Sequence, residues 1–122
     1  MRRLIAALGF FLGFVTFAAP ALAQSQAQTI APSEAQKHIG QTVTVVGPVG
    51  NVYGARSGAI FIDVGGRFPD NPFTAVIFPG DAGKFPAARA LGGRTIAING
   101  VVQLYRNRAE IVLRSAGQLQ AR

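Results

Sequence analysis

The stretch SGAIFIDVGGRFPDNPFTAVIF, residues 57–78, carries the pattern that decides the fold. Residues 59–64 and 73–78 are short runs rich in β-branched and aromatic side chains, which is typical of strands. Between them, the glycine pair at 65–66 and the PDNP cluster at 69–72 indicate a wide turn. We therefore expect two consecutive strands joined by a long loop.

Upstream, residues 41–53 predict the longest strand, because polar and apolar residues alternate through TVTV at 42–45. Gly47 and Pro48 interrupt the alternation, and proline cannot donate to a ladder, so we expect a bulge or an edge there. A bulged strand can bend and serve both sides of a small barrel. Residues 33–40 predict a short helix, with Ser33 and Gln36 as a capping box and Gly40 as a left-handed cap.

Downstream, residues 81–91 predict a helical segment that Pro86 interrupts. Residues 94–105 predict a fourth strand with a bulge at Gly100, and residues 108–113 predict a fifth strand after a tight turn at Arg106 and Asn107. The order β-β-β-α-β-β after a short leading helix predicts an all-β fold with short helices, the five-stranded Greek-key barrel of the OB type. SH3-type barrels also have five strands, but they normally lack the helix between the third and fourth.

The amino-terminal residues have the features of an export signal. Arg2 and Arg3 precede an apolar run over residues 4–19, and Ala21-Leu22-Ala23 gives the small-x-small pattern of a cleavage site. A retained membrane anchor is the alternative, but the run is shorter than the ~20 residues that span a bilayer. We expect a signal peptide at 1–23, a flexible leader at 24–32, a domain at 33–119, and a periplasmic or secreted protein.

Composition narrows the partners of this domain. Residues 24–122 contain ten basic residues, eight of them arginine, and five acidic residues, and therefore carry a net charge of +5. A basic surface favours nucleic acid, anionic lipid or acidic polysaccharide. Arginine-rich codon usage in a high-GC genome is an equally good explanation of the charge. The absence of cysteine and the single histidine argue against a zinc site, and we expect neither a metal nor a cofactor.

Residues 38–119 resemble a known family. The resemblance lies in HIGQTVTVVGPV, in the 57–78 stretch and in ALGGRTIAINGVVQLYRNRAEIVLRS. These segments are similar to G-x-x-F-L-N-F-G-x-x-Y-P-x-x-x-F-T-A-V-I followed by L-x-G-K-x-V-x-V-x-G-x-I-x-x-Y-x-G-R-P-E-I-V-L, the pattern of bacterial exported OB-fold proteins of the nucleic-acid-binding OB-domain type. The resemblance implies an OB fold and nucleic-acid binding. Asp63, Phe68, Asn107 and Ala109 replace the asparagine, tyrosine, glycine and proline of that pattern.

The second predicted strand separates two faces. Ile60, Ile62 and Val64 share one face, and Phe61 and Asp63 share the other, because side chains alternate along a strand. An unpaired carboxylate is costly to bury, so we expect Asp63 on an open outer face. Phe61 would then lie on the outer surface, where it can stack on a base. The alternative is that Phe61 packs under the 65–72 turn or against Phe73.

Two loops carry the remaining candidate residues. Arg56 lies in GARSG at 54–58, and Arg106 and Arg108 lie beside Tyr105 in YRNRAE. OB domains bind single strands across the second and third strands between the corresponding loops. The predicted ligand-binding residues are therefore Arg56, Phe61, Tyr105, Arg106 and Arg108, with a solvated hairpin tip as the alternative for the arginines.

No residues are predicted to be catalytic. The three aspartates occupy separate elements, and His38 falls in the last turn of the leading helix, where a cation complements the dipole. We therefore expect a non-catalytic exported module for single-stranded nucleic acid or another acidic polymer. The alternatives are a periplasmic module that binds an envelope protein or a polysaccharide, and a stress-related ligand-binding module.

Overall fold

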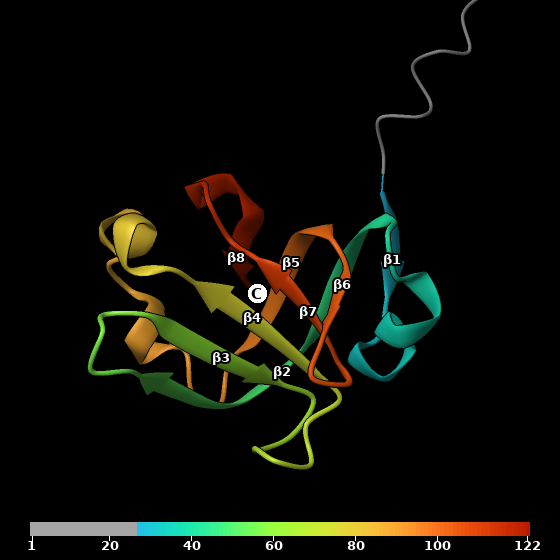
Figure 1. Ribbon diagram of the computed structural model, residues 1–122, viewed down its shortest axis with the longest axis horizontal. Coiled ribbons are helices and arrows are strands. Elements are labelled where there is room, and N and C mark those ends of the chain that lie inside the picture. Colours follow the sequence, from blue (N-terminus) through green and yellow to red (C-terminus); the bar gives the residue numbers. More distant parts are fainter. Residues whose placement is uncertain (1–26) are drawn as a thin grey trace, which may run out of the picture.

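The computed structural model describes residues 27–122, so the predicted signal peptide at 1–23 and the first leader residues at 24–26 lie outside the described residues. The described chain is mostly strand, with short 3₁₀ helices, as expected (Figure 1). Its elements are, in order, β1 (Gln28–Ile30), η2 (Pro32–His38), β2 (Thr42–Gly54), β3 (Ile60–Val64), β4 (Phe73–Ile77), η3 (Pro79–Lys84), η4 (Ala88–Ala90), β5 (Thr95–Val101), β6 (Gln103–Tyr105), β7 (Arg108–Val112), η5 (Ala116–Gln118) and β8 (Leu119–Ala121).

The strands form one curled sheet in the order β6-β7-β4-β3-β2-β5-β8, and β1 pairs with β2 (Figure 1). The hydrogen-bonded path is not closed and has eight strands where five were predicted, while the all-β fold with short helices is confirmed. The predicted fourth strand is two strands, β5 on β2 and β6 on β7, separated by Val102. The break has a physical cause, because the Val102 side chain is fully buried while its backbone bonds to Gly40 and Gln41. Val102 thus connects β5, which pairs with β2, to β6, which pairs with β7.

The long strand β2 serves both parts of the sheet, as predicted. Residues 42–48 pair with β5, and residues 49–54 pair with β3. The irregularity lies between Val49 and Asn51, not at Gly47 and Pro48. A Cβ at Gly50 would collide with the backbone carbonyl of Gly66, so the strand bulges where the 65–72 loop approaches it.

Gly100 is not a bulge, contrary to the prediction, and pairs in register with Val43. A Cβ at Gly100 would lie 2.6 Å from the Ile111 side chain, so this glycine allows β5 and β7 to pack closely.

The predicted flexible leader is wrong at Gln28–Ile30, which form β1 in a parallel pairing with residues 43–45 of β2. Ile30 is buried in the core, which fixes the strand in place. The leading helix starts at Pro32, and its cap differs from the predicted one. The Ala31 N–H donates to the Glu34 carboxylate at 3.0 Å, while the Gln36 amide reaches the carbonyl of Asn107.

The predicted interrupted helix at 81–91 is two 3₁₀ turns, η3 and η4, on either side of Pro86. Phe85, Ala88 and Leu91 from this region are buried and join the core. His38 ends η2, where its Nδ1 lies 2.9 Å from the side-chain oxygen of Gln41. Within residues 27–122, no helix has the length and hydropathy needed to cross a membrane.

Candidate ligand-binding groove

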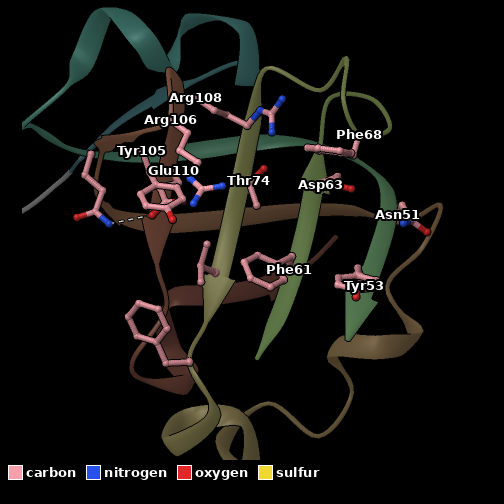
Figure 2. Close-up of a pocket in the computed structure, with 13 residues that line it drawn as sticks. Asn51, Tyr53, Phe61, Asp63, Phe68, Thr74, Tyr105, Arg106, Arg108 and Glu110 are labelled. Carbon is pink, nitrogen blue, oxygen red and sulfur yellow. Dashed lines mark hydrogen bonds between the residues drawn. The ribbon is translucent and has the colours of Figure 1, made fainter. Parts of the chain in front are cut away.

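The outer face of the sheet carries a groove of about 980 Å³. Figure 2 shows that strands β2, β3, β4, β6 and β7 and the 65–72 loop contribute its side chains. Ile60, Ile62 and Val64 of β3 point the other way and are buried in the core, as the alternation predicted. The groove is lined by Asn51, Tyr53, Phe61, Asp63, Phe68, Thr74, Val76, Phe78, Gln103, Tyr105, Arg106, Arg108 and Glu110.

Strand register arranges much of this lining in two parallel rows. Side chains directly opposite each other on paired strands lie about 5 Å apart, so a continuous register forms a row across the sheet. One, which we call the polar row, contains one residue from each of five strands: Asn51, Asp63, Thr74, Glu110 and Gln103. The second, the apolar row, contains Tyr53, Phe61 and Val76.

Phe61 lies on the outer surface, as predicted, and not inside the sheet. Its ring stacks on that of Tyr53, with the centroids 6.2 Å apart and the planes at 29°. Phe61 is half-buried, whereas Tyr53 is 57% exposed. The exposed ring of the pair therefore belongs to Tyr53, a residue that the sequence analysis did not select.

The β6–β7 hairpin forms the tight turn predicted at Arg106 and Asn107, which have φ angles of 50° and 67°. Each arginine of the hairpin lies over a ring. The Arg106 guanidinium is 5.2 Å from the centroid of Tyr105, and that of Arg108 is 4.9 Å from the centroid of Phe68. Arg106 lies in the turn and Arg108 begins β7, so the two guanidinium groups contact different rings.

Arg108 also donates to the backbone carbonyl of Pro69 at 2.8 Å. Its side chain therefore ties the hairpin to the 65–72 loop. Asn71 anchors the same loop from below, because its amide donates to the Phe73 carbonyl at 2.7 Å and to the Thr74 hydroxyl at 2.9 Å. At this end of the groove, the Arg108 bond is thus a long-range contact, whereas the two buried bonds of Asn71 are local.

Asp63 lies on the outer face of the sheet but is buried, which corrects the prediction that this face leaves it exposed. It is only 5% exposed, because the 65–72 loop, which carries Phe68, folds back beside it (Figure 2). Burial raises the pKa of Asp63 above 3.8, and the Phe68 N–H and the charge of Arg108 oppose that rise. The carboxylate is thus a partly compensated charge at the floor of the groove.

The structure brings together four of the five predicted site residues, Phe61, Tyr105, Arg106 and Arg108, and leaves Arg56 outside the lining. The 54–58 loop lies at the start of β3, whereas strand pairing places the β6–β7 hairpin at the opposite end. The groove is therefore not framed by both arginine loops as expected.

Several residues that line the groove were not among the predicted ligand-binding residues. Alternation along the strands could have found Asn51 with Tyr53 and Gln103 with Tyr105, since each pair shares a face. No local pattern indicates Phe68, which reaches the groove only because the 65–72 loop folds back. Within residues 27–122, no cluster of three or more histidine, cysteine or acidic side chains is arranged to hold a metal ion.

No family model and no curated protein matches this chain. Its fold is similar to that of the OBody AM1L10 in complex with hen egg-white lysozyme, with a TM-score of 0.58 and 18% identity over 78% of this chain and 93% of that one. It is also similar to aspartyl-tRNA synthetase from Entamoeba histolytica, with a TM-score of 0.55 and 15% identity over 90% of this chain. The chain spans 24% of that synthetase. The described part of this protein therefore has the oligonucleotide/oligosaccharide-binding (OB) fold.

Proposed function

We propose that this protein is a non-catalytic binding module for single-stranded nucleic acid. The observation that carries the proposal is the set of exposed aromatic rings that line one groove. Tyr53, Phe68, Phe78 and Tyr105 are between 47% and 65% exposed. Exposed rings on a concave face favour a flat ligand, and stacking on a base contributes ~1–3 kcal/mol per base.

The two arginines of the hairpin add an electrostatic component. Arg106 and Arg108 line the groove and form no ion pair within residues 27–122. A guanidinium held over a ring keeps donors at its edge free for a phosphate oxygen. The aspartyl-tRNA synthetase from Entamoeba histolytica, part of which is similar in fold, acts on a tRNA, and that supports the same ligand class.

Export is a further part of the proposal and rests on the sequence of residues 1–23. Cleavage after Ala23 would release the module into the periplasm or the medium. Amino-terminal sequencing of the protein recovered from the periplasmic fraction of a bacterial host tests this part separately. A product that retains residues 1–23 would contradict it.

An oligosaccharide is the second candidate ligand, and the charge balance of the groove favours it. Asp63 and Glu110 offset the formal charge of Arg106 and Arg108, so the groove as a whole is close to neutral. Carboxylates accept hydrogen bonds from sugar hydroxyls, and OB domains bind oligosaccharides as well as oligonucleotides.

Fluorescence anisotropy with a labelled oligothymidylate, at low and high salt, tests the nucleic-acid proposal. We expect binding that weakens steeply with salt, because phosphate contacts release counterions. Tyr105→Ala should lower the affinity on the order of tenfold through lost stacking. The control is Leu104→Ala, since Leu104 is 51% exposed but lies on the opposite face of β6.

Absence of binding at low salt would overturn the nucleic-acid proposal. Equal losses in Tyr105→Ala and Leu104→Ala would place the ligand outside the groove. If a neutral oligosaccharide binds in its place and Tyr105→Ala abolishes that binding, the second candidate is correct.

A further inference from the structure

The polar row contains hydrogen-bond acceptors that the fold leaves unused. The Thr74 hydroxyl accepts from Asn71, and the Gln103 amide donates to one oxygen of Glu110 at 3.0 Å. The other carboxylate oxygen of Glu110 forms no hydrogen bond within residues 27–122. Glu110 also has no cation within ion-pair distance in this part of the chain. An ionised carboxylate can accept about four hydrogen bonds, so this side chain offers capacity to a ligand.

We propose that Glu110 is a specificity-determining residue that selects guanine in the bound strand; this inference rests on the proposed nucleic-acid function. Guanine presents two adjacent donors on its Watson–Crick edge, N1–H and the N2 amino group, which match the two oxygens of one carboxylate. Thymine and uracil present a single N3–H between two carbonyl oxygens, and a carboxylate repels those oxygens. The Glu110 carboxylate is thus complementary to guanine, whereas it repels the carbonyl oxygens of thymine and uracil.

Its position fits this role. Gln103 and Tyr105 share one face of β6, and they pair with Glu110 and Arg108 of β7. Tyr105 and Glu110 are therefore diagonal neighbours across the two strands, and both line the groove (Figure 2). A base stacked on Tyr105 directs its edge toward the polar row. The Gln103 amide holds the carboxylate in orientation for that edge.

Asp63, the other carboxylate of the polar row, has a different role. It is 5% exposed, so its carboxylate is covered beside the 65–72 loop and is not accessible to a ligand. Glu110 is only partly buried and stands between Thr74 and Gln103 in the polar row. The accessible acceptor is therefore Glu110.

The test compares binding of an oligothymidylate with the same oligomer carrying isolated guanines, which cannot form quadruplexes. We expect the wild-type protein to prefer the guanine oligomer on the order of tenfold, since well-made paired base contacts discriminate by about that factor or more. Replacing guanine by hypoxanthine removes the N2 amino group, and we expect part of the preference to be lost. The comparison of guanine with hypoxanthine uses the wild-type protein, so it does not depend on the folding of a variant.

Glu110→Gln keeps the size of the side chain and removes the charge. We expect it to bind plain oligothymidylate at least as tightly as the wild type, because one negative charge is gone, and to lose the guanine preference. The matched control is Asp81→Asn, which also removes a carboxylate but one paired with Lys84 outside the groove. This variant should retain the preference.

The outcomes separate the two proposals. If the wild-type protein binds both oligomers equally, or if Glu110→Gln retains the guanine preference, the role of Glu110 is wrong while the nucleic-acid function stands. If it binds neither oligomer, both proposals are wrong.

Discussion

The two ends of strand β3 carry similar residues, arginine and glycine near an aromatic ring, but they are held in different ways. At the carboxyl end, the 65–72 loop is tied to the hairpin by Arg108 and to β4 by Asn71. At the amino end, the hydrogen bonds that close the 54–58 loop are all local: from the Ala55 N–H to the Ala59 carbonyl, from the Gly58 N–H to the Ala55 carbonyl, and from the Ala59 N–H to the Ser57 hydroxyl. Of these two loops, only the 65–72 loop lines the groove.

The difference teaches that an arginine within a loop does not by itself bring that loop into the groove; the 65–72 loop is held there by the long-range bond from Arg108 and by the buried bonds of Asn71. A loop fixed by buried hydrogen bonds presents its side chains in one arrangement, which lowers the entropy lost on binding. A locally closed loop at the surface does not offer that advantage. Three matched pairs of variants test this contrast, and the pH dependence of stability at Asp63 adds a fourth measurement.

The largest expected difference is between Gly50→Ala and Gly54→Ala. A Cβ at Gly50 would overlap the backbone of Gly66, whereas one at Gly54 would meet only the guanidinium of Arg89, whose flexible side chain can move. We expect Gly50→Ala to lower the free energy of unfolding by about 3 kcal/mol or more and Gly54→Ala by less than about 1 kcal/mol. Urea unfolding measures both, and equal losses would contradict the contrast between the two ends.

Loop anchoring gives the next effect. Asn71 is buried and makes two hydrogen bonds, so Asn71→Ala should cost about 1–3 kcal/mol. In the other loop, the Ser57 hydroxyl accepts a long bond of 3.3 Å from the Ala59 N–H, and Ser57→Ala should cost less than about 0.5 kcal/mol. Thermal unfolding followed by circular dichroism compares them. A larger loss in Ser57→Ala would show that the 54–58 loop is the better anchored one.

Binding sharpens the comparison further. Arg106→Gln should weaken binding of an oligothymidylate several-fold and reduce the salt dependence by about one counterion, since it removes one phosphate contact. Arg56→Gln, which changes the same charge outside the groove lining, should leave the salt dependence nearly unchanged. Affinities measured over a series of salt concentrations give both slopes. Identical slopes for the two variants would show that Arg56 contacts the ligand as Arg106 does.

The smallest effect concerns the pH dependence of stability at Asp63. Burial raises its pKa in the folded protein, so the folded state binds this proton more tightly than the unfolded chain. The resulting stability is present below the unfolded value of 3.8 and is lost as the pH rises through the folded-state pKa. Asp63→Asn, which stays neutral, should be modestly more stable than the wild type at neutral pH and should match it in acid. Unfolding of both proteins across this pH range measures the difference, and a variant that is less stable at neutral pH would contradict it.

Much of the fold could be predicted because its signals are local. The alternation of Ile60, Ile62 and Val64 with Phe61 and Asp63 separated the faces of β3 correctly. The two-residue turn at Arg106 and Asn107 was also visible in the sequence. Both depend on neighbours in the chain, whose geometry is set by the backbone itself.

The sequence by itself thus determined the all-β fold, most of its strands and the side of β3 on which Phe61 lies. Only the tertiary structure decided that Asn51, Asp63, Thr74, Glu110 and Gln103 stand in one row. It also decided that Asp63 is covered and that Arg56 lies apart from the hairpin. The physical reason is that side-chain alternation is a property of each strand, whereas register and loop packing depend on pairings between residues distant in the chain.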